Sequence, residues 1–193
     1  YVGILDIPTW HILFQGRNFK LPFEGIHIAR DFMLALAVAC QFDIPLECIT
    51  NLRPTLPTGR NRLLQLGAIT VYDETYNSSP ESVIASLDLI ATKSGCKYAV
   101  LGNMLELGSN SIDYHINIVK HAVEIGINGL VICASGPEAS AMYLAGKSLD
   151  HIELVSSPED ALHPLINWLK DGDCLLLKAS RQVALEKLMP LLE

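Results

Sequence analysis

The sequence predicts an α/β protein built on a mostly parallel, doubly wound sheet. Three observations support this prediction: short apolar runs alternate with helical stretches, half of the 193 residues are hydrophobic, and three helical stretches carry a proline in their first turn. Strands that are apolar along their whole length are typical of a parallel sheet that helices cover on both faces. With right-handed crossovers, such elements form a Rossmann-like layered sandwich.

The first 57 residues follow a different pattern. Loosely alternating apolar residues over about 10–23 predict two short strands with a turn at Gly16 between them. A helix is expected over about 27–42 and a shorter one over about 46–52. The chain starts with Tyr1 rather than methionine and enters strand-like sequence at once, so we expect it to be a fragment.

The segment 53–59 is the expected domain boundary. It holds two prolines and a glycine, and a proline restricts its own backbone and that of the residue before it. The predicted domains are therefore 1–57 and 58–193.

The second domain carries the regular alternation of strands and helices. Pro80, Pro137 and Pro158 each follow a serine or glycine that could cap a helix, and each precedes a glutamate near the positive helix end. Strands are expected at 68–72, 98–101, 130–133, 152–155 and 174–177, and helices at about 80–93, 112–125, 137–146, 158–170 and 181–192.

Charge and residue usage exclude several classes of protein. Fourteen Lys and Arg against 21 Asp and Glu give a net charge of −7 with no basic run, which argues against a nucleic-acid partner. The longest apolar stretch, 32–40, is about half of a bilayer span, and no signal peptide is recognisable, so we expect a cytoplasmic protein without membrane insertion. The five cysteines are expected to be buried, reduced thiols. The six histidines lack the spacing of metal ligands, so we expect them at the surface or at helix ends and predict no metal site.

Polar residues follow several of the predicted strands, where ligands of open α/β sheets bind. Asp73 and Glu74 adjoin at a strand end beside Tyr76 and Asn77, and a binding role explains two neighbouring acids better than a polar loop does. The stretch 102–108 brackets an amide and a carboxylate with two glycines, which is a weak signal alone.

Two further stretches could bind anions. Lys178, Ser180 and Arg181 precede the last predicted helix, where cations and free backbone N–H groups would suit a carboxylate or phosphate, although a structural role is equally open. At the boundary, Arg60 or Arg62 could reach a phosphate or could be a solvated loop arginine. The chain contains no Gly-x-x-x-x-Gly-Lys-Ser/Thr loop, so it has no complete triphosphate site of its own.

In their order along the chain, these stretches resemble the Mur ligase family over nearly the whole sequence. Within the family, they are most similar to the ligase that adds D-alanyl-D-alanine to UDP-N-acetylmuramoyl-tripeptide in peptidoglycan synthesis. The stretches that carry the resemblance are Gly25-Ile26-His27, Gly59-Arg60, 73–82 (DETYNSSPES), 100–108 (VLGNMLELG), His115 and 177–181 (LKASR).

The resemblance implies that 1–57 is the C-terminal remnant of a central ATP-binding domain and that 58–193 is the Rossmann-like C-terminal ligase domain. ATP would phosphorylate the tripeptide carboxylate, and the amine of D-alanyl-D-alanine would attack the acyl phosphate. ATP and Mg²⁺ would be bound mainly by the part of the central domain that this sequence lacks, so the fragment alone is expected to be inactive. The partners would be these two substrates, and the protein is expected to be a monomer.

The family pattern also implies roles for single residues. Arg60 would contact the ATP phosphates and act in catalysis, Glu74 would hold the ribose hydroxyls, and Lys178 would act in catalysis and in substrate binding. The other expected nucleotide-binding residues are Asp73, Tyr76, Asn77, His27 and Asp31, and the other expected substrate-binding residues are Asn103, Glu106, Ser180 and Arg181.

The sequence departs from the family pattern at several of these places. The adenine-contacting stretch, 27–31, lacks both family asparagines, Glu74 and Asn103 stand where the family has aspartates, and Ala179 stands where it has glycine. Two alternatives remain open: a non-catalytic Rossmann-like binding module, and a sibling ligase that adds another amino acid. The third residue of the tripeptide, diaminopimelate or lysine, is not specified by this sequence.

Overall fold

The computed structural model describes residues 1–50, 54–55 and 57–193. The chain divides into two compact units, Tyr1–Leu56 and Pro57–Glu193. Residues 53 and 56 of the expected boundary, and the end of the short helix expected over 46–52, lie outside the described residues.

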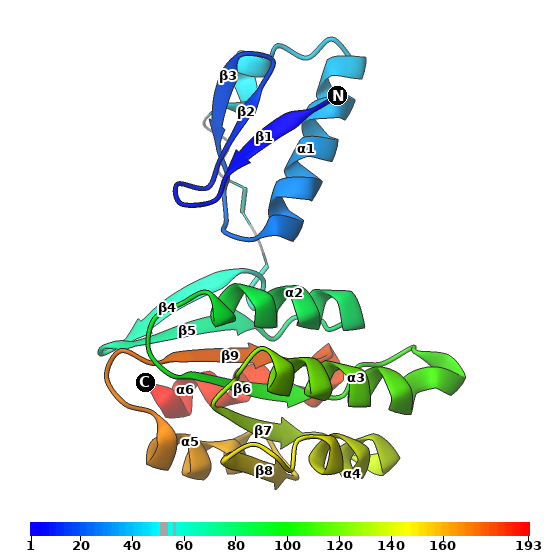
Figure 1. The fold of residues 1–193 in the computed structure, drawn as a ribbon, viewed down its shortest axis with the longest axis vertical. Coiled ribbons are helices and arrows are strands. Elements are labelled where there is room, and N and C mark those ends of the chain that lie inside the picture. The colour runs from blue at the N-terminus through cyan, green and yellow to red at the C-terminus, as the bar shows by residue number, and fades with distance from the viewer. Residues whose placement is uncertain (51–53, 56) are drawn as a thin grey trace. The chain divides into compact units, whose positions relative to one another are not determined.

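The first unit is a small sheet with one long helix (Figure 1). Its apolar residues on the strands alternate, so that Ile12, Phe14 and Phe19 point to one face, where Phe32 and Leu36 of the helix cover them. The sequence predicted two strands, and the structure adds a third at the start of the chain. The elements are the antiparallel strands β1 (Gly3–Asp6), β2 (His11–Phe14) and β3 (Arg17–Lys20), helix α1 (Ile26–Gln41) and a 3-10 helix (Leu46–Ile49).

The second unit contains a six-stranded sheet in the order β4-β5-β9-β6-β7-β8. The five expected strands are present and parallel, which confirms the predicted fold class. They are β5 (Ile69–Glu74), β6 (Lys97–Gly102), β7 (Gly129–Cys133), β8 (His151–Val155) and β9 (Cys174–Lys178). The sequence did not predict β4 (Arg62–Leu66), an antiparallel edge strand, because it is half exposed and includes charged and polar residues rather than a continuous apolar run.

Helices cover both faces of this sheet (Figure 1). Residues of α2 (Pro80–Ala91), α3 (Ser111–Glu124) and α4 (Gly136–Ala145) share one core with Ala99, Leu101 and Leu130. Residues of α5 (Leu162–Trp168) and α6 (Met189–Leu192) share the other core with Val100, Val131 and Leu177. Successive residues of β6 therefore point into opposite cores, which is why residues 98–101 of this central strand are all apolar.

The helix ends agree with the sequence signals in one case and differ in two. Ser79 caps α2 in a reciprocal capping box with Ser82, as its position before Pro80 predicted. The helix expected over 158–170 begins as a 3-10 turn, and α5 starts late enough to place Pro164 in its first turn, where a missing N–H is tolerated.

The prediction of one long helix over 181–192 is wrong. The segment instead forms two 3-10 turns, Arg181–Val183 and Leu185–Leu188, and the short α6, with Ala184 in the left-handed conformation (φ 55°). Pro190 would have stood inside the expected helix, where it cannot donate to residue 186, and the structure keeps it in the first turn of α6.

No helix among the residues that the structure describes is both long and apolar enough to cross a membrane.

A buried aspartate, Asp173, lies at the edge of the sheet where β6 and β9 begin, and it accepts hydrogen bonds from the backbone there. Asp173 is 5% exposed, and its carboxylate accepts from the backbone N–H groups of Cys96 (2.9 Å) and Lys170 (2.8 Å). These bonds satisfy one donor directly before β6 and one donor in the loop between α5 and β9.

We expect Asp173→Ala to lower the free energy of unfolding by about 2 kcal/mol, because it leaves these donors without their acceptor. The exposed Asp171→Ala is the control and should be close to neutral. Urea denaturation of both variants checks this, and equal stabilities would contradict the assigned role of Asp173.

Candidate active-site edge of the sheet

The strand order gathers the expected site residues of the second unit. Because β9 lies between β5 and β6, the loops after these three parallel strands leave the same edge of the sheet side by side. The chain leaves β6 toward α3 on one face and leaves β9 toward α6 on the other. Adjacent strands whose connections diverge in this way open a crevice at their carboxyl ends, where open α/β sheets bind ligands.

Glu74 and Lys178 form an ion pair at this edge. They are direct neighbours in the β5–β9 register, and Lys178 Nζ donates to Glu74 Oε2 at 2.8 Å and to the carbonyl oxygen of Asn77 at 3.3 Å. Ser86 of α2 donates to the same Glu74 oxygen at 2.9 Å. The side chain of Lys178 is only 3% exposed and that of Glu74 13%, so the pair is shielded from water and joins β9 to the β5–α2 loop.

Two arginines flank Tyr76. The guanidinium carbon of Arg60 lies 4.1 Å from the ring centroid and that of Arg181 lies 5.2 Å from it, which are cation–π distances. Both arginines are exposed. A small cavity of about 260 Å³ opens beside them, lined by Pro57, Thr58, Thr75, Tyr76, Arg181 and Glu186.

Gly59 brings Arg60 to this ring. The carbonyl oxygen of Gly59 accepts from the N–H of Tyr76 at 3.0 Å, and Gly59 has a φ of 79°, which favours glycine. A Cβ at this position would lie 2.7 Å from Thr75 Oγ1 and 2.9 Å from Tyr76 N. The segment can therefore approach the β5–α2 loop this closely only because residue 59 has no side chain.

Asp73 is turned away from this cluster. Its Oδ1 accepts from the Thr75 hydroxyl (2.7 Å) and N–H (3.2 Å), while its Oδ2 has no hydrogen-bond partner among the described residues. Arg62 Nη1 lies 4.0 Å from Oδ2 across the β4–β5 pair. The two arginines that follow the domain boundary thus differ in their contacts: Arg62 faces Asp73, and Arg60 faces Tyr76.

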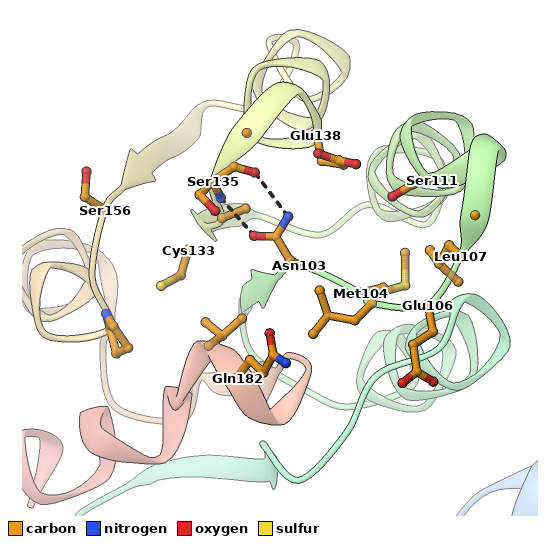
Figure 2. A pocket seen from close by; sticks show the side chains of 16 residues that line it. Asn103, Met104, Glu106, Leu107, Ser111, Cys133, Ser135, Glu138, Ser156 and Gln182 are labelled. Carbon is orange, nitrogen blue, oxygen red and sulfur yellow. Dashed lines mark hydrogen bonds between the residues drawn. The ribbon is translucent and has the colours of Figure 1, made fainter.

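A larger cavity of about 660 Å³ lies over the ends of β6 and β7 (Figure 2). Asn103 crosses between the two strand exits: its Oδ1 accepts from Ser135 N (2.8 Å) and its Nδ2 donates to Ser135 O (3.2 Å). The side-chain amide of Asn103 is thereby engaged by protein backbone. The cavity is lined by 103–108, Ser111, Cys133, Ala134, Ser135, Gly136, Glu138, Ser156, Pro158, Gln182 and Val183.

Ser180 connects the two parts of the edge. It is 3% exposed, its hydroxyl accepts from Leu105 N at 3.1 Å, and its N–H donates to the carbonyl oxygen of Asn103 at 3.0 Å. Gly102 permits this approach, because a Cβ there would lie 2.6 Å from Ala179 Cβ. The loops after β6 and β9 are therefore fixed to each other.

Glu138, which sequence reasoning missed, lies at the rim of this cavity at the start of α4 (Figure 2). Hydrogen bonds from its own backbone N–H and from the Ser111 hydroxyl lower the pKa of its carboxyl group. The carboxylate stabilises the N-terminal end of α4. The glutamate after Pro137 in the sequence was the signal for this position.

His115 corrects another expectation. It lies within α3 and is 0% exposed, rather than at the surface or a helix end. Its ring bonds to Met104 of the cavity loop and to Ser111 of its own helix. Sequence periodicity could not find this role, because the partner loop has no regular spacing from α3.

Three predicted residues remain: His27, Asp31 and Glu106. His27 and Asp31 belong to α1 of the first unit, four residues apart on one helix face, with Asp31 exposed and His27 half-buried. Glu106 lies on the cavity loop, exposed and with a φ of 62°. Among the described residues, no group of three or more His, Cys, Asp or Glu side chains could hold a metal ion.

Comparison with known proteins identifies the family of this chain. Residues 59–181 match the family model described as Mur ligase, glutamate ligase domain. The chain belongs to the Mur ligase family. This assignment confirms the resemblance drawn from the sequence, and the matched range contains every expected site residue of the second unit.

Two curated relatives are UDP-N-acetylmuramoyl-tripeptide–D-alanyl-D-alanine ligases. The protein of Synechocystis is 34% identical over 178 residues, which are 91% of this chain and 39% of the relative. The protein of Treponema pallidum is 30% identical over 200 residues, which cover 94% of this chain and 40% of the relative. The chain thus spans about 40% of the length of these Mur ligases.

Solved structures of Mur ligases superpose on this chain. MurF from Acinetobacter baumannii superposes with a TM-score of 0.80 at 27% identity, over 94% of this chain and 41% of that one. MurF from Thermotoga maritima, solved in complex with ADP, gives 0.78 at 25% identity, over 94% and 42%. A folylpolyglutamate synthase/dihydrofolate synthase from Yersinia pestis, at 17% identity and a TM-score of 0.66, shares the fold.

The contribution of the Glu74–Lys178 ion pair to stability can be tested by substitution. Lys178→Met keeps the length of the side chain but leaves Glu74 without its cation, so we expect the free energy of unfolding to fall by about 3 kcal/mol. Adding Glu74→Gln should recover part of the loss, because the double variant has no unpaired buried charge. Guanidinium denaturation of the single and double variants measures this, and a double variant less stable than Lys178→Met would contradict it.

The different exposure of the five cysteines leads to a further prediction. All five are free, but Cys48 and Cys96 are exposed, so the expectation of burial is wrong for these two. Burial, with the charges of Asp160 and Glu159, raises the pKa of the Cys133 thiol to about 11, and burial also raises the pKa of Cys174.

At about pH 8 these two thiols stay protonated, and thiolate is the reactive form, so iodoacetamide should alkylate Cys48 and Cys96 first. Peptide mass spectrometry of the native chain checks the order, with a urea-unfolded sample as the control in which all five react alike. Rapid native labelling of Cys133 would contradict the assigned burial.

Proposed function

We propose that this chain is the C-terminal part of an ATP-dependent ligase that joins D-alanyl-D-alanine to UDP-N-acetylmuramoyl-tripeptide. The observation that carries the proposal is the gathering of Arg60, Tyr76, Glu74, Lys178 and Arg181 at one strand edge beside a roomy cavity. The names of the relatives, at about 30% identity over about 90% of the chain, support it. Residues 1–57 would then be the remnant of the central ATP-binding domain and 58–193 the C-terminal ligase domain.

The charged part of the edge suits phosphate and carboxylate groups. Arg60 and Arg181 are exposed guanidinium groups held on one ring, and such groups bind oxyanions through paired N–H donors. We assign Arg60 to the ATP phosphates and Arg181, with Ser180 and Lys178, to a substrate carboxylate. Stacking on Tyr76 orients the two guanidinium groups before a ligand arrives.

Glu74 is the proposed acceptor of the ribose hydroxyls, with Asp73, Tyr76 and Asn77 around it. Lys178 and Ser86 hold its Oε2, so the carboxylate has one orientation in which its other oxygen can accept from hydroxyl groups. His27 and Asp31 are the proposed contacts of the base. When bound, ATP supplies the phosphoryl group that activates the carboxylate.

The chemistry of the donors also limits what this chain can hold. The described residues offer a pair of arginines for phosphate oxygens and no cluster of metal ligands. As the family resemblance implies, we propose that Mg²⁺ is bound mainly by the part of the central domain that this sequence lacks. We further propose a monomer that works in the cytoplasm, where ATP and UDP-linked precursors are available.

The 660 Å³ cavity is the proposed site of D-alanyl-D-alanine. Its walls combine polar side chains, such as those of Ser156 and Gln182, with apolar side chains such as Leu107 and Val183. A small dipeptide with two methyl groups, an amide and charged ends needs this mixture of partners. Asn103 and Glu106 lie on the loop that would contact it.

Arg60 and Arg62 provide a matched test in the complete gene product. Arg60→Ala should lower kcat/KM for ATP by about a hundredfold, because it removes a cation at the phosphates. Arg62→Ala should have a small effect, since that arginine faces Asp73. Formation of the ligated pentapeptide, followed by mass spectrometry, is the measurement.

The same assay separates the alternatives. The 193-residue chain alone should neither hydrolyse ATP nor ligate, because it lacks the phosphate-binding loop. A complete protein that ligates another amino acid in place of D-alanyl-D-alanine would point to a sibling activity, and one that ligates nothing would point to a binding module. Either result would overturn the proposed function.

A further inference from the structure

Three successive residues of the cavity loop are each held by a different element. Asn103 is bonded to the backbone of Ser135 after β7, Met104 N donates to His115 Nε2 on α3 at 2.9 Å, and Leu105 N donates to Ser180 Oγ after β9. Ser135 and Ser180 are joined to the loop from strand ends. His115 is the anchor that comes from a helix.

The hydrogen bonds determine the state of the His115 ring. A backbone N–H can only donate, so Nε2, which faces Met104 N, must accept and carries no proton. Nδ1 lies 2.7 Å from the carbonyl oxygen of Ser111, which can only accept, so Nδ1 carries the proton. The ring is therefore neutral, in the Nδ1–H tautomer, with both nitrogens satisfied and no exposure to water.

The loop that His115 holds has an unfavourable backbone. Glu106 has a φ of 62° and Gly108 a φ of 63°, and a left-handed conformation costs free energy at a non-glycine residue such as Glu106. Such a conformation persists only where surrounding contacts fix it. The N–H of Met104 lies two residues before Glu106, and residues 103–108 all line the cavity. The bond to His115 therefore bears on the shape of the binding surface.

From these contacts we propose that His115 is a positioning residue: its neutral Nε2 holds the Met104 amide and thereby sets the cavity wall that receives the dipeptide. The role of the wall rests on the proposed function, whereas the tautomer and the Met104 bond do not. His115 itself is buried behind the loop and touches no substrate.

Two substitutions distinguish the hydrogen bond of His115 to Met104 from its hydrogen bond to Ser111. His115→Gln can place its side-chain oxygen near the position of Nε2 and so keep an acceptor for Met104 N. His115→Asn is too short to reach Met104 but can still donate to the carbonyl oxygen of Ser111. Both remove the ring and lose similar packing, so a merely structural role would affect them alike.

The test has a spectroscopic and a kinetic arm. In the 193-residue chain labelled with ¹⁵N-histidine, the His115 shifts should report protonated Nδ1 and bare Nε2, with a coupling from Nε2 to the Met104 amide. In the complete gene product, His115→Asn should raise KM for D-alanyl-D-alanine by about tenfold. The kcat and the KM for ATP should stay near wild type, and His115→Gln should restore most of the dipeptide KM.

Each arm can overturn the inference. An Nε2–H tautomer or a charged ring near neutral pH would exclude the Met104 bond, whatever the enzyme does. Equal effects of the two substitutions, or none, would exclude the positioning role. If the wild-type gene product does not ligate, the proposed function fails, and the spectroscopic arm still decides whether His115 holds Met104.

Discussion

The insertion of β9 between β5 and β6 is the constraint on which the rest of the second unit depends. β9 is the last strand along the chain, yet it pairs in parallel with the strand that ends at Glu74 and with the one that ends at Gly102. Its own end therefore delivers Lys178 to one neighbour and Ser180 to the other. The charged cluster and the cavity become parts of one surface because a single strand connects them.

The two halves of this surface differ in how they are stabilised. Around Tyr76, the charge is set by two exposed arginines and by an ion pair that is shielded from water. Around the cavity, neutral hydrogen bonds from Asn103, His115 and Ser180 hold the loop.

Sequence patterns predicted the sheet well because its central strands β6, β7 and β9 are buried on both faces and therefore almost entirely apolar. They missed β4, which is half exposed, and they extended 181–192 into one helix although Pro190 limits it. The site residues followed from polar groups at strand ends together with the family resemblance. Periodicity could not supply the pairings themselves: that Lys178 meets Glu74, or that His115 meets Met104, depends on strand order and loop path.

Asn103 shows what one atom changes at the cavity. The family resemblance has an aspartate here, and a carboxylate could accept from Ser135 N but could not donate to Ser135 O. The amide makes both bonds and adds no charge to a cavity already lined by Glu106 and Glu138. A third negative group would add to the repulsion between Glu106 and Glu138 at the cavity and would make any anion less favourable there. With nitrogen in place of one oxygen, residue 103 joins the loops after β6 and β7 through two hydrogen bonds and leaves the cavity without a further negative charge.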